Sequence, residues 1–176
     1  MTSEVTEDLK VRTATPDDVH QIMEMGLAAN NEIAVFKANP QKILQDIWPA
    51  LHCQGGIIGV IGKPGKVIEG GIFLKLTSLG YSDDLFLDER IVYVRPEFRR
   101  GGRPDEKHCH SRKLCEFAKE TSDKLGIPLI MGIATSVGFR GKARMYKRFF
   151  GRQAGAFFVY GKKHHEEMAK QLVAAE

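Results

Sequence analysis

The sequence predicts one α/β domain whose mixed, mostly antiparallel sheet is flanked by helices. The expected elements run strand, helix, helix, three strands, helix, strand, helix, strand, and such alternation is typical of α/β domains. The first three consecutive strands follow one another through turns or loops, which favours antiparallel pairing, whereas a helix separates the later strands, which favours a parallel crossover. A chain of 176 residues, 43% of them hydrophobic, fits a single domain over residues 1–176.

A short strand and two helices are expected first, after a flexible tail over residues 1–10. Residues 11–14 alternate in polarity like a strand. Thr15 with Pro16, and later Asn39 with Pro40, mark helix starts, because Thr and Asn cap helices and proline suits the first helical position. The apolar faces that we expect to be buried are Val19, Ile22, Met23, Gly26 and Leu27 in the first helix, and Ile43, Leu44, Ile47, Trp48 and Leu51 in the second.

A β meander is expected next. Its strands cover residues 56–61, 67–76 and 89–94, with a turn at 63–66 and a polar loop at 78–86. Gly70 and Gly71 are a plausible β-bulge. Pro96 ends the last of these strands, and the segment from Arg99 to about Glu106 is rich in Gly, Arg and Pro, which predicts a loop.

The C-terminal part predicts a βαβ unit. A helix carries Leu114, Phe117, Ala118, Thr121 and Leu125 on one face, and Gly126 is suited to end it. A strand at 129–133, a helix at 139–150 and a strand at 154–160 follow. A terminal helix is expected over residues 164–175, within a C-terminal tail at 162–176.

The bulk composition excludes several classes of protein. No apolar run approaches the roughly 20 residues needed to span a bilayer, and the N-terminal residues do not resemble a signal peptide. Three cysteines cannot all pair within the chain, which fits a reducing compartment. We therefore expect a cytoplasmic protein with no membrane partner. The net charge of +4 and the dense basic stretches indicate an anionic partner.

The segment from Ile91 to Gly102 is the most informative. A strand runs into a basic, glycine-rich loop, and the loop runs into a helix. A helix N-terminus offers free backbone amides and the positive end of its dipole, glycines let the backbone approach an anion, and arginines bind phosphate in bidentate fashion. The residues alone therefore predict a phosphate site, with a solvated basic loop as the alternative.

Two motifs extend this prediction. The run Val94-Arg95-Pro96-Glu97-Phe98-Arg99-Arg100-Gly101-Gly102 resembles the Val-x-Pro-Glu-Tyr-Arg-x-x-Gly-x-Gly signature of GCN5-related N-acetyltransferases (GNAT), and residues 145–151, Met-Tyr-Lys-Arg-Phe-Phe-Gly, resemble their Leu-Tyr-x-x-x-Gly-Phe signature. The resemblance covers nearly the whole chain and is closest to short acyltransferase-like proteins encoded by phages. It implies a sheet that is splayed between its fourth and fifth strands.

The sequence departs from the family pattern after Gly102. Arg103 and Pro104 follow, and the leucine expected early in the next helix comes several residues late, at Leu114. The loop therefore carries extra residues, and the amides at the helix start are those of Cys109 to Arg112. The asparagine that the family often places before its last helix is absent, with Phe139 near that position. These departures bear on cofactor binding rather than on the fold.

The resemblance implies acetyl-CoA as co-substrate and direct acyl transfer to an amine. Its pantetheine pairs with the backbone of the fourth strand, and its pyrophosphate lies on the loop and the following helix start. Glu89, with Asp88 behind it, is the candidate general base, and Tyr146 is the candidate acid that protonates the leaving thiolate. The alternatives are loop carboxylates and a core tyrosine. The expected cofactor-binding residues are Val92, Tyr93, Val94, Arg99, Arg100, Gly101, Gly102, Ser111 and Arg112.

Other functions stay open at this point. The same fold with a damaged cofactor loop could serve as a structural module in a larger assembly, such as a phage particle, and the location would then be the virion. The basic helix from Arg140 to Arg148 could bind nucleic acid, although no known module matches. His108, Cys109, His110 and Cys115 fit no zinc spacing, so we expect no metal. The acyl acceptor, a protein or a small molecule, is unidentified, and the loops at 30–36 and 77–87 are expected to recognise it.

Overall fold

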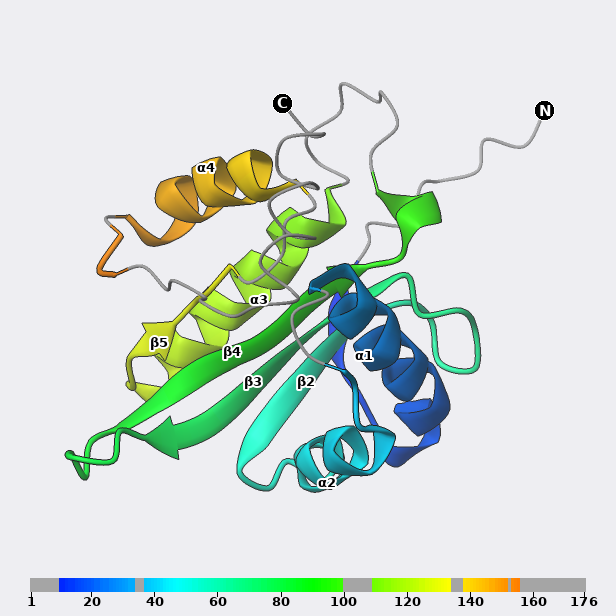
Figure 1. Ribbon diagram of the computed structural model, residues 1–176, viewed down its shortest axis with the longest axis horizontal. Coiled ribbons are helices and arrows are strands. Elements are labelled where there is room, and N and C mark those ends of the chain that lie inside the picture. The colour runs from blue at the N-terminus through cyan, green and yellow to red at the C-terminus, as the bar shows by residue number, and fades with distance from the viewer. Residues whose placement is uncertain (1–9, 34–36, 100–108, 134–137, 152, 156–176) are drawn as a thin grey trace.

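The computed structural model describes residues 10–33, 37–99, 109–133, 138–151 and 153–155. Their strands form one sheet in the order β1-β2-β3-β4-β5, with α1 and α2 on one face and α3 on the other (Figure 1). The strands are β1 (Val11–Thr13), β2 (Gly56–Ile61), β3 (Gly70–Ser78), β4 (Leu85–Val94) and β5 (Leu129–Ile130). The helices are α1 (Val19–Ile33), α2 (Pro40–Leu51), α3 (His110–Leu125) and α4 (Phe139–Phe150), with 3₁₀ turns at Pro16–Asp18 and Pro96–Phe98.

The sheet is antiparallel from β1 to β4, and β5 is parallel to β4. The β4–β5 pairing consists of Leu87 opposite Leu129 and Asp88 opposite Ile130. Beyond Asp88, the rest of β4 has no strand partner on this side among the described residues. The predicted mixed sheet, splayed between its fourth and fifth strands, is therefore confirmed, and the open edge of β4 begins at Glu89.

Both predicted helix starts are confirmed; Asn39 caps its helix with its side chain, whereas the side chain of Thr15 makes no capping bond and Asp18 accepts from the Thr15 backbone instead. Asn39 Oδ1 accepts hydrogen bonds from the amides of Gln41 and Lys42, at 3.0 and 3.2 Å. At the first start, Asp18 accepts from the Thr15 amide at 2.9 Å. The two carboxylate oxygens of Asp18 also accept hydrogen bonds from the two terminal nitrogens of Arg12, at 2.7 and 2.8 Å. The guanidinium of Arg12 lowers the pKa of this buried carboxyl and ties β1 to the start of the helical segment.

The bulge lies on β4 and not at Gly70 and Gly71, where it was expected. These glycines pair regularly with Val94 and Tyr93. A Cβ on Gly70 would lie 3.0 Å from the carbonyl oxygen of Tyr93, so the missing side chain lets β3 and β4 lie close together there. The register instead shifts between Phe73–Ile91 and Leu74–Glu89, which leaves Arg90 as the extra residue. A bulge changes which face the following residues occupy.

The bulge sends Glu89 and Ile91 to opposite faces of the sheet, although they are two residues apart. Ile91 joins the core under α1 and α2, whereas Glu89 contacts Tyr146 of α4 on the other side. β4 also starts at Leu85, earlier than predicted, because Leu85 to Leu87 continue the ladder with β3.

Two apolar cores lie on the two faces of the sheet. The first includes Ile22 and Met25 of α1 and Ile47 of α2, and the second includes Leu114 and Ala118 of α3. Three residues predicted in apolar faces are exposed instead, namely Leu44 (40%), Trp48 (47%) and Leu125 (58%). For α2 the reason is that it contacts the sheet mainly at β2, so a narrower stripe of the helix is covered.

The later elements follow the prediction in part. Gly126 ends α3 with φ of 66°, a conformation that favours glycine, and α4 has the predicted bounds. β5 is shorter than expected because β4 diverges from it after Ile130. Ala154 and Gly155 are not in a strand. Residues 156–160, both tails (1–9 of the first and 162–176) and the whole of the 100–108 segment lie outside the described residues. No described helix has the length and apolarity that crossing a membrane requires.

Candidate active site at the open edge of β4

A carboxylate and a phenol meet where β4 and β5 separate. Glu89 is half-buried, and its Oε2 accepts a hydrogen bond from the Gly132 amide at 3.0 Å. Gly132 follows β5 in the chain, so the Glu89 side chain takes an amide that the parallel ladder leaves free. The same oxygen accepts a bond from Tyr146 Oη at 3.4 Å. The structure thus brings together the predicted base and the predicted acid.

Burial dominates the ionisation of Glu89. It raises the pKa of this carboxyl from 4.5 to about 7, because a charged carboxylate is poorly solvated there. The charge of Lys142, the Gly132 amide and the Tyr146 hydroxyl oppose this rise, and the nearby charge of Asp88 adds to it. A carboxyl with a pKa near neutrality can both accept and release a proton under physiological conditions.

Tyr146 is positioned by α4 and is only 8% exposed. Its ring meets that of Phe150 edge to face, with centroids 5.6 Å apart. Burial raises the pKa of the phenol, and the adjacent Glu89 raises it further. The hydroxyl therefore keeps its proton at neutral pH and stands as a hydrogen-bond donor beside the carboxylate.

Lys142 belongs to the same cluster, although neither sequence motif pointed to it. It lies one helical turn before Tyr146 on α4, and its Nζ donates to the Val92 carbonyl of β4 at 3.4 Å. Burial lowers the pKa of this amine, against the raising effect of Glu89. The spacing of four residues from Tyr146 could have found it, since such residues share a helix face.

Cys115 of α3 lies near the cluster as a neutral thiol. Its side chain is fully buried, and burial raises its pKa to about 12, with Glu89 adding to the effect. Because the thiolate is the nucleophilic form, this geometry does not favour Cys115 as a nucleophile.

The predicted cofactor residues of β4 all lie in the part of the strand that β5 does not pair with among the described residues. Val92 and Val94 face the core beneath α3, and Tyr93 faces the core beneath α1. The carbonyl of Val92 receives Lys142, and that of Val94 receives Arg99 Nε at 2.6 Å.

The predicted phosphate-binding residues do not form one group in the structure. Arg99 is directed toward α1, where it binds Glu32 at 2.6 Å and lies 4.9 Å from the centre of the Tyr93 ring. Arg100, Gly101 and Gly102 lie outside the described residues. Ser111 and Arg112 lie in the first turn of α3. The cap residue of this helix is Cys109, so the helix starts late, as the extra residues of the preceding segment predicted.

Arg112 lies along the side of α3 that is directed toward α4. Its Nε is 3.9 Å from Glu116, and its guanidinium lies 5.6 Å from the centre of the Phe149 ring. In the same turn His110 binds Glu69. Among the described residues, no group of three or more His, Cys, Asp or Glu side chains could hold a metal ion; His108 lies outside them.

Comparisons with known proteins yield matches of structure alone. No protein-family model and no curated protein matches the sequence. A possible acetyltransferase from Clostridium difficile 630 matches with a TM-score of 0.61 and 18% identity, over 90% of this chain and 100% of the other. The comparisons do not support the resemblance to phage-encoded proteins.

Two aminoglycoside-related structures also match. AAC(6')-Iy, in complex with the bisubstrate analogue CoA-S-monomethyl-acetylneamine, has a TM-score of 0.59 and 13% identity, over 89% of this chain and 99% of the other. The aminoglycoside acetyltransferase meta-AAC0020, from an uncultured soil metagenomic sample and in complex with sisomicin, has a TM-score of 0.58 and 16% identity, over 90% of this chain and 100% of the other. At these identities the likeness is one of fold, and the chain has the mixed, splayed sheet of the GCN5-related N-acetyltransferases.

Proposed function

We propose that this chain is an acyl-CoA-dependent N-acyltransferase, which moves an acetyl group from acetyl-CoA to a primary amine by direct attack. One observation carries the proposal: Tyr146 donates to Glu89 at 3.4 Å beside the edge of β4 that β5 leaves unpaired. This pair favours an enzyme over a structural module, because holding a carboxyl where burial suppresses its charge costs stability that a purely structural role does not require.

The proton path follows from this pair. The amine nitrogen attacks the thioester carbonyl carbon and loses a proton to Glu89 as the C–N bond forms. The C–S bond then breaks, and the leaving sulfur takes a proton from Tyr146. Glu89 returns its proton to Tyr146 through their hydrogen bond. The net change is one proton moved from nitrogen to sulfur, and both side chains end in their starting states.

The open edge of β4 supports the binding of an extended, amide-containing chain such as pantetheine. Backbone groups from Glu89 onward have no β5 partner among the described residues, so they can pair with amides of a ligand. In the free protein the Val92 carbonyl is held by Lys142, and this weak contact has to yield when a ligand amide takes its place. The CoA-linked analogue bound to AAC(6')-Iy supports a CoA-type ligand on this fold.

The first turn of α3 is the site where we expect the pyrophosphate of CoA to bind. The backbone amides and dipole at a helix N-terminus favour an anion, and Ser111 and Arg112 lie in this turn with a hydroxyl and a guanidinium; the Arg112 guanidinium would have to give up its contact with Glu116 to bind phosphate. Arg99 contributes less, because its guanidinium is already bound to Glu32 and to the carbonyl of Val94.

Calorimetric titration with acetyl-CoA tests the proposal. We expect micromolar binding, followed by amine-dependent release of CoA thiol in a colorimetric assay. Without amine, the release should fall to the level of slow hydrolysis. No binding at millimolar acetyl-CoA would overturn the proposed function.

A further inference from the structure

The amine of Lys142 lies against the unpaired part of β4. Lys142 is a half-buried residue near the start of α4, and its Nζ donates to the carbonyl oxygen of Val92 at 3.4 Å. Val92 belongs to the part of β4 that has no β5 partner among the described residues. The amine therefore lies at the edge of the strand along which we propose that the pantetheine of CoA binds.

Lys142 shares a helix face with the proposed acid. It is four residues before Tyr146 on α4, so the two side chains lie one turn apart, about 6 Å along the helix axis. Tyr146 donates to Glu89 at 3.4 Å, and the negative charge of Glu89 attracts the amine of Lys142. The lysine amine and the proton-transfer pair therefore form one cluster.

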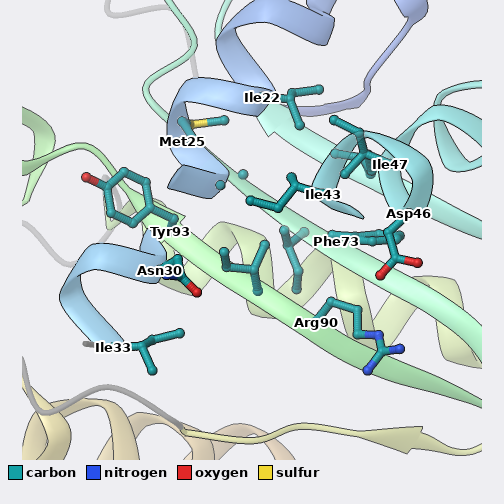
Figure 2. A pocket seen from close by; sticks show the side chains of 15 residues that line it. Ile22, Met25, Asn30, Ile33, Ile43, Asp46, Ile47, Phe73, Arg90 and Tyr93 are labelled. Atoms are coloured by element: carbon teal, nitrogen blue, oxygen red, sulfur yellow. The ribbon is translucent and has the colours of Figure 1, made fainter. Parts of the chain in front are cut away.

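This cluster lies on the side of β4 away from α1 and α2. Figure 2 shows Arg90 and Tyr93 of β4 beside a cavity beneath these two helices. Val92, by contrast, packs into the core beneath α3, and Glu89 contacts Tyr146 of α4. The fold itself thus places a primary amine on the same side of the strand as the proposed base.

Burial favours the nucleophilic form of this amine. It lowers the pKa of Lys142, although the charge of Glu89 opposes this effect. A lysine attacks a carbonyl carbon only in its neutral form, and desolvation of the side chain increases the neutral fraction. The burial that makes Lys142 unusual for a lysine therefore also makes it more reactive toward a thioester.

Binding of an acyl-CoA would release this amine from β4. The hydrogen bond to the Val92 carbonyl is long at 3.4 Å and therefore weak, so a ligand amide that pairs with this carbonyl displaces Nζ. The lysine side chain is flexible, and the charge of Glu89 attracts its amine. The displaced amine then lies closer to the two side chains that we propose to handle the protons of the reaction.

We propose that Lys142 is an acetyl acceptor within the chain, and that acetyl-CoA bound along β4 acetylates its Nζ. This inference rests on the proposed acetyl transfer. The neutral amine attacks the thioester carbonyl carbon, and the C–S bond breaks after the C–N bond forms. One nitrogen proton passes to Glu89, the sulfur takes a proton from Tyr146, and Glu89 returns its proton to Tyr146. The products are the acetylated lysine, which has lost its positive charge, and the free thiol of CoA.

Peptide mass spectrometry of the full chain, incubated with acetyl-CoA and no added amine, tests this inference. Lys147 is the internal control, because it is exposed on the same helix. We expect Lys142 to be acetylated at least about 10²-fold faster than Lys147, since a positioned amine beside a general base reacts faster than a free one. The first-order rate constant should not depend on protein concentration, because the transfer takes place within one chain.

Substitutions test the role of the cluster. Glu89→Gln should slow acetylation of Lys142 by about 10²-fold and leave that of Lys147 unchanged, while calorimetry checks that acetyl-CoA still binds. Lys147→Arg is the matched substitution on α4, and it should leave acetylation of Lys142 unchanged. If the Glu89→Gln protein does not fold, Tyr146→Phe, which removes only a hydroxyl group, decides whether the reaction depends on the pair.

The possible failures are distinct. If acetyl-CoA supports transfer to an added amine, but Lys142 is acetylated no faster than Lys147 or at a rate constant proportional to protein concentration, the inference is wrong and the proposed function stands. If acetylation of Lys142 depends on Glu89 but no added amine is acetylated, the inference holds and transfer to a separate amine is wrong. If acetyl-CoA does not bind, both are wrong.

Discussion

The ionisation of Glu89 offers a sharp test of the site, and Glu89→Gln is the substitution that isolates it. The fold raises the pKa of this carboxyl from 4.5 to about 7, so the folded state binds the proton more tightly than the unfolded state does. Glu89 therefore contributes stability that is fully present below a pH of 4.5 and is lost as the pH rises through about 7. Glutamine has a similar shape and does not titrate.

The magnitude follows from the shift. At about 1.4 kcal/mol per pKa unit, the rise from 4.5 to about 7 corresponds to about 3 kcal/mol. The wild-type free energy of unfolding, minus that of Glu89→Gln, should therefore fall by about 3 kcal/mol between about pH 4 and about pH 8. This comparison removes the effect of every other titrating group, because both proteins share them.

Urea unfolding followed by circular dichroism, at a series of pH values, measures this difference. Asp83→Asn is the matched control, since Asp83 is an exposed carboxylate in the loop before β4, away from this site. If the Glu89→Gln difference stays flat from acid to alkaline pH, burial does not suppress the charge of Glu89, and the electrostatic account of the site is wrong.

Three further predictions concern the proposed reaction. Tyr146→Phe should lower kcat by about 10²-fold or more, as the loss of a general acid does, while calorimetry finds acetyl-CoA affinity unchanged; an unaltered kcat would remove Tyr146 from its role. Lys142→Met deletes the charge that lowers the pKa of Glu89, so the acidic limb of the kcat/KM profile should move to higher pH; a limb that does not move would show that Glu89 does not sense this lysine. Arg112→Ala should weaken acetyl-CoA binding by about ten-fold, the value of one charge-assisted hydrogen bond, and added salt should reduce the difference; equal affinities would place the pyrophosphate elsewhere.

The local signals in the sequence predicted local structure well. Thr15 and Asn39 start helical segments, and Gly126 ends one, because capping and left-handed backbone depend on a few neighbouring residues. The meander and the β–α–β unit also followed from the order of turns and helices. The apolar faces were less accurate at Leu44, Trp48 and Leu125, since the width of a buried stripe depends on what the helix packs against.

The sequence by itself determined the α/β class and the order of the elements from β1 to α4, and the family resemblance made Glu89 and Tyr146 site candidates. The tertiary structure decided which face each side chain takes. The bulge at Arg90 separates Glu89 from Ile91, brings Glu89 to Tyr146 and leaves Ile91 in the core beneath α1 and α2. A bulge depends on the register between two strands, and Lys142 and Arg99 take their positions from contacts with residues 50 and 67 positions away. Such pairings depend on the whole fold, and no short stretch of sequence specifies them.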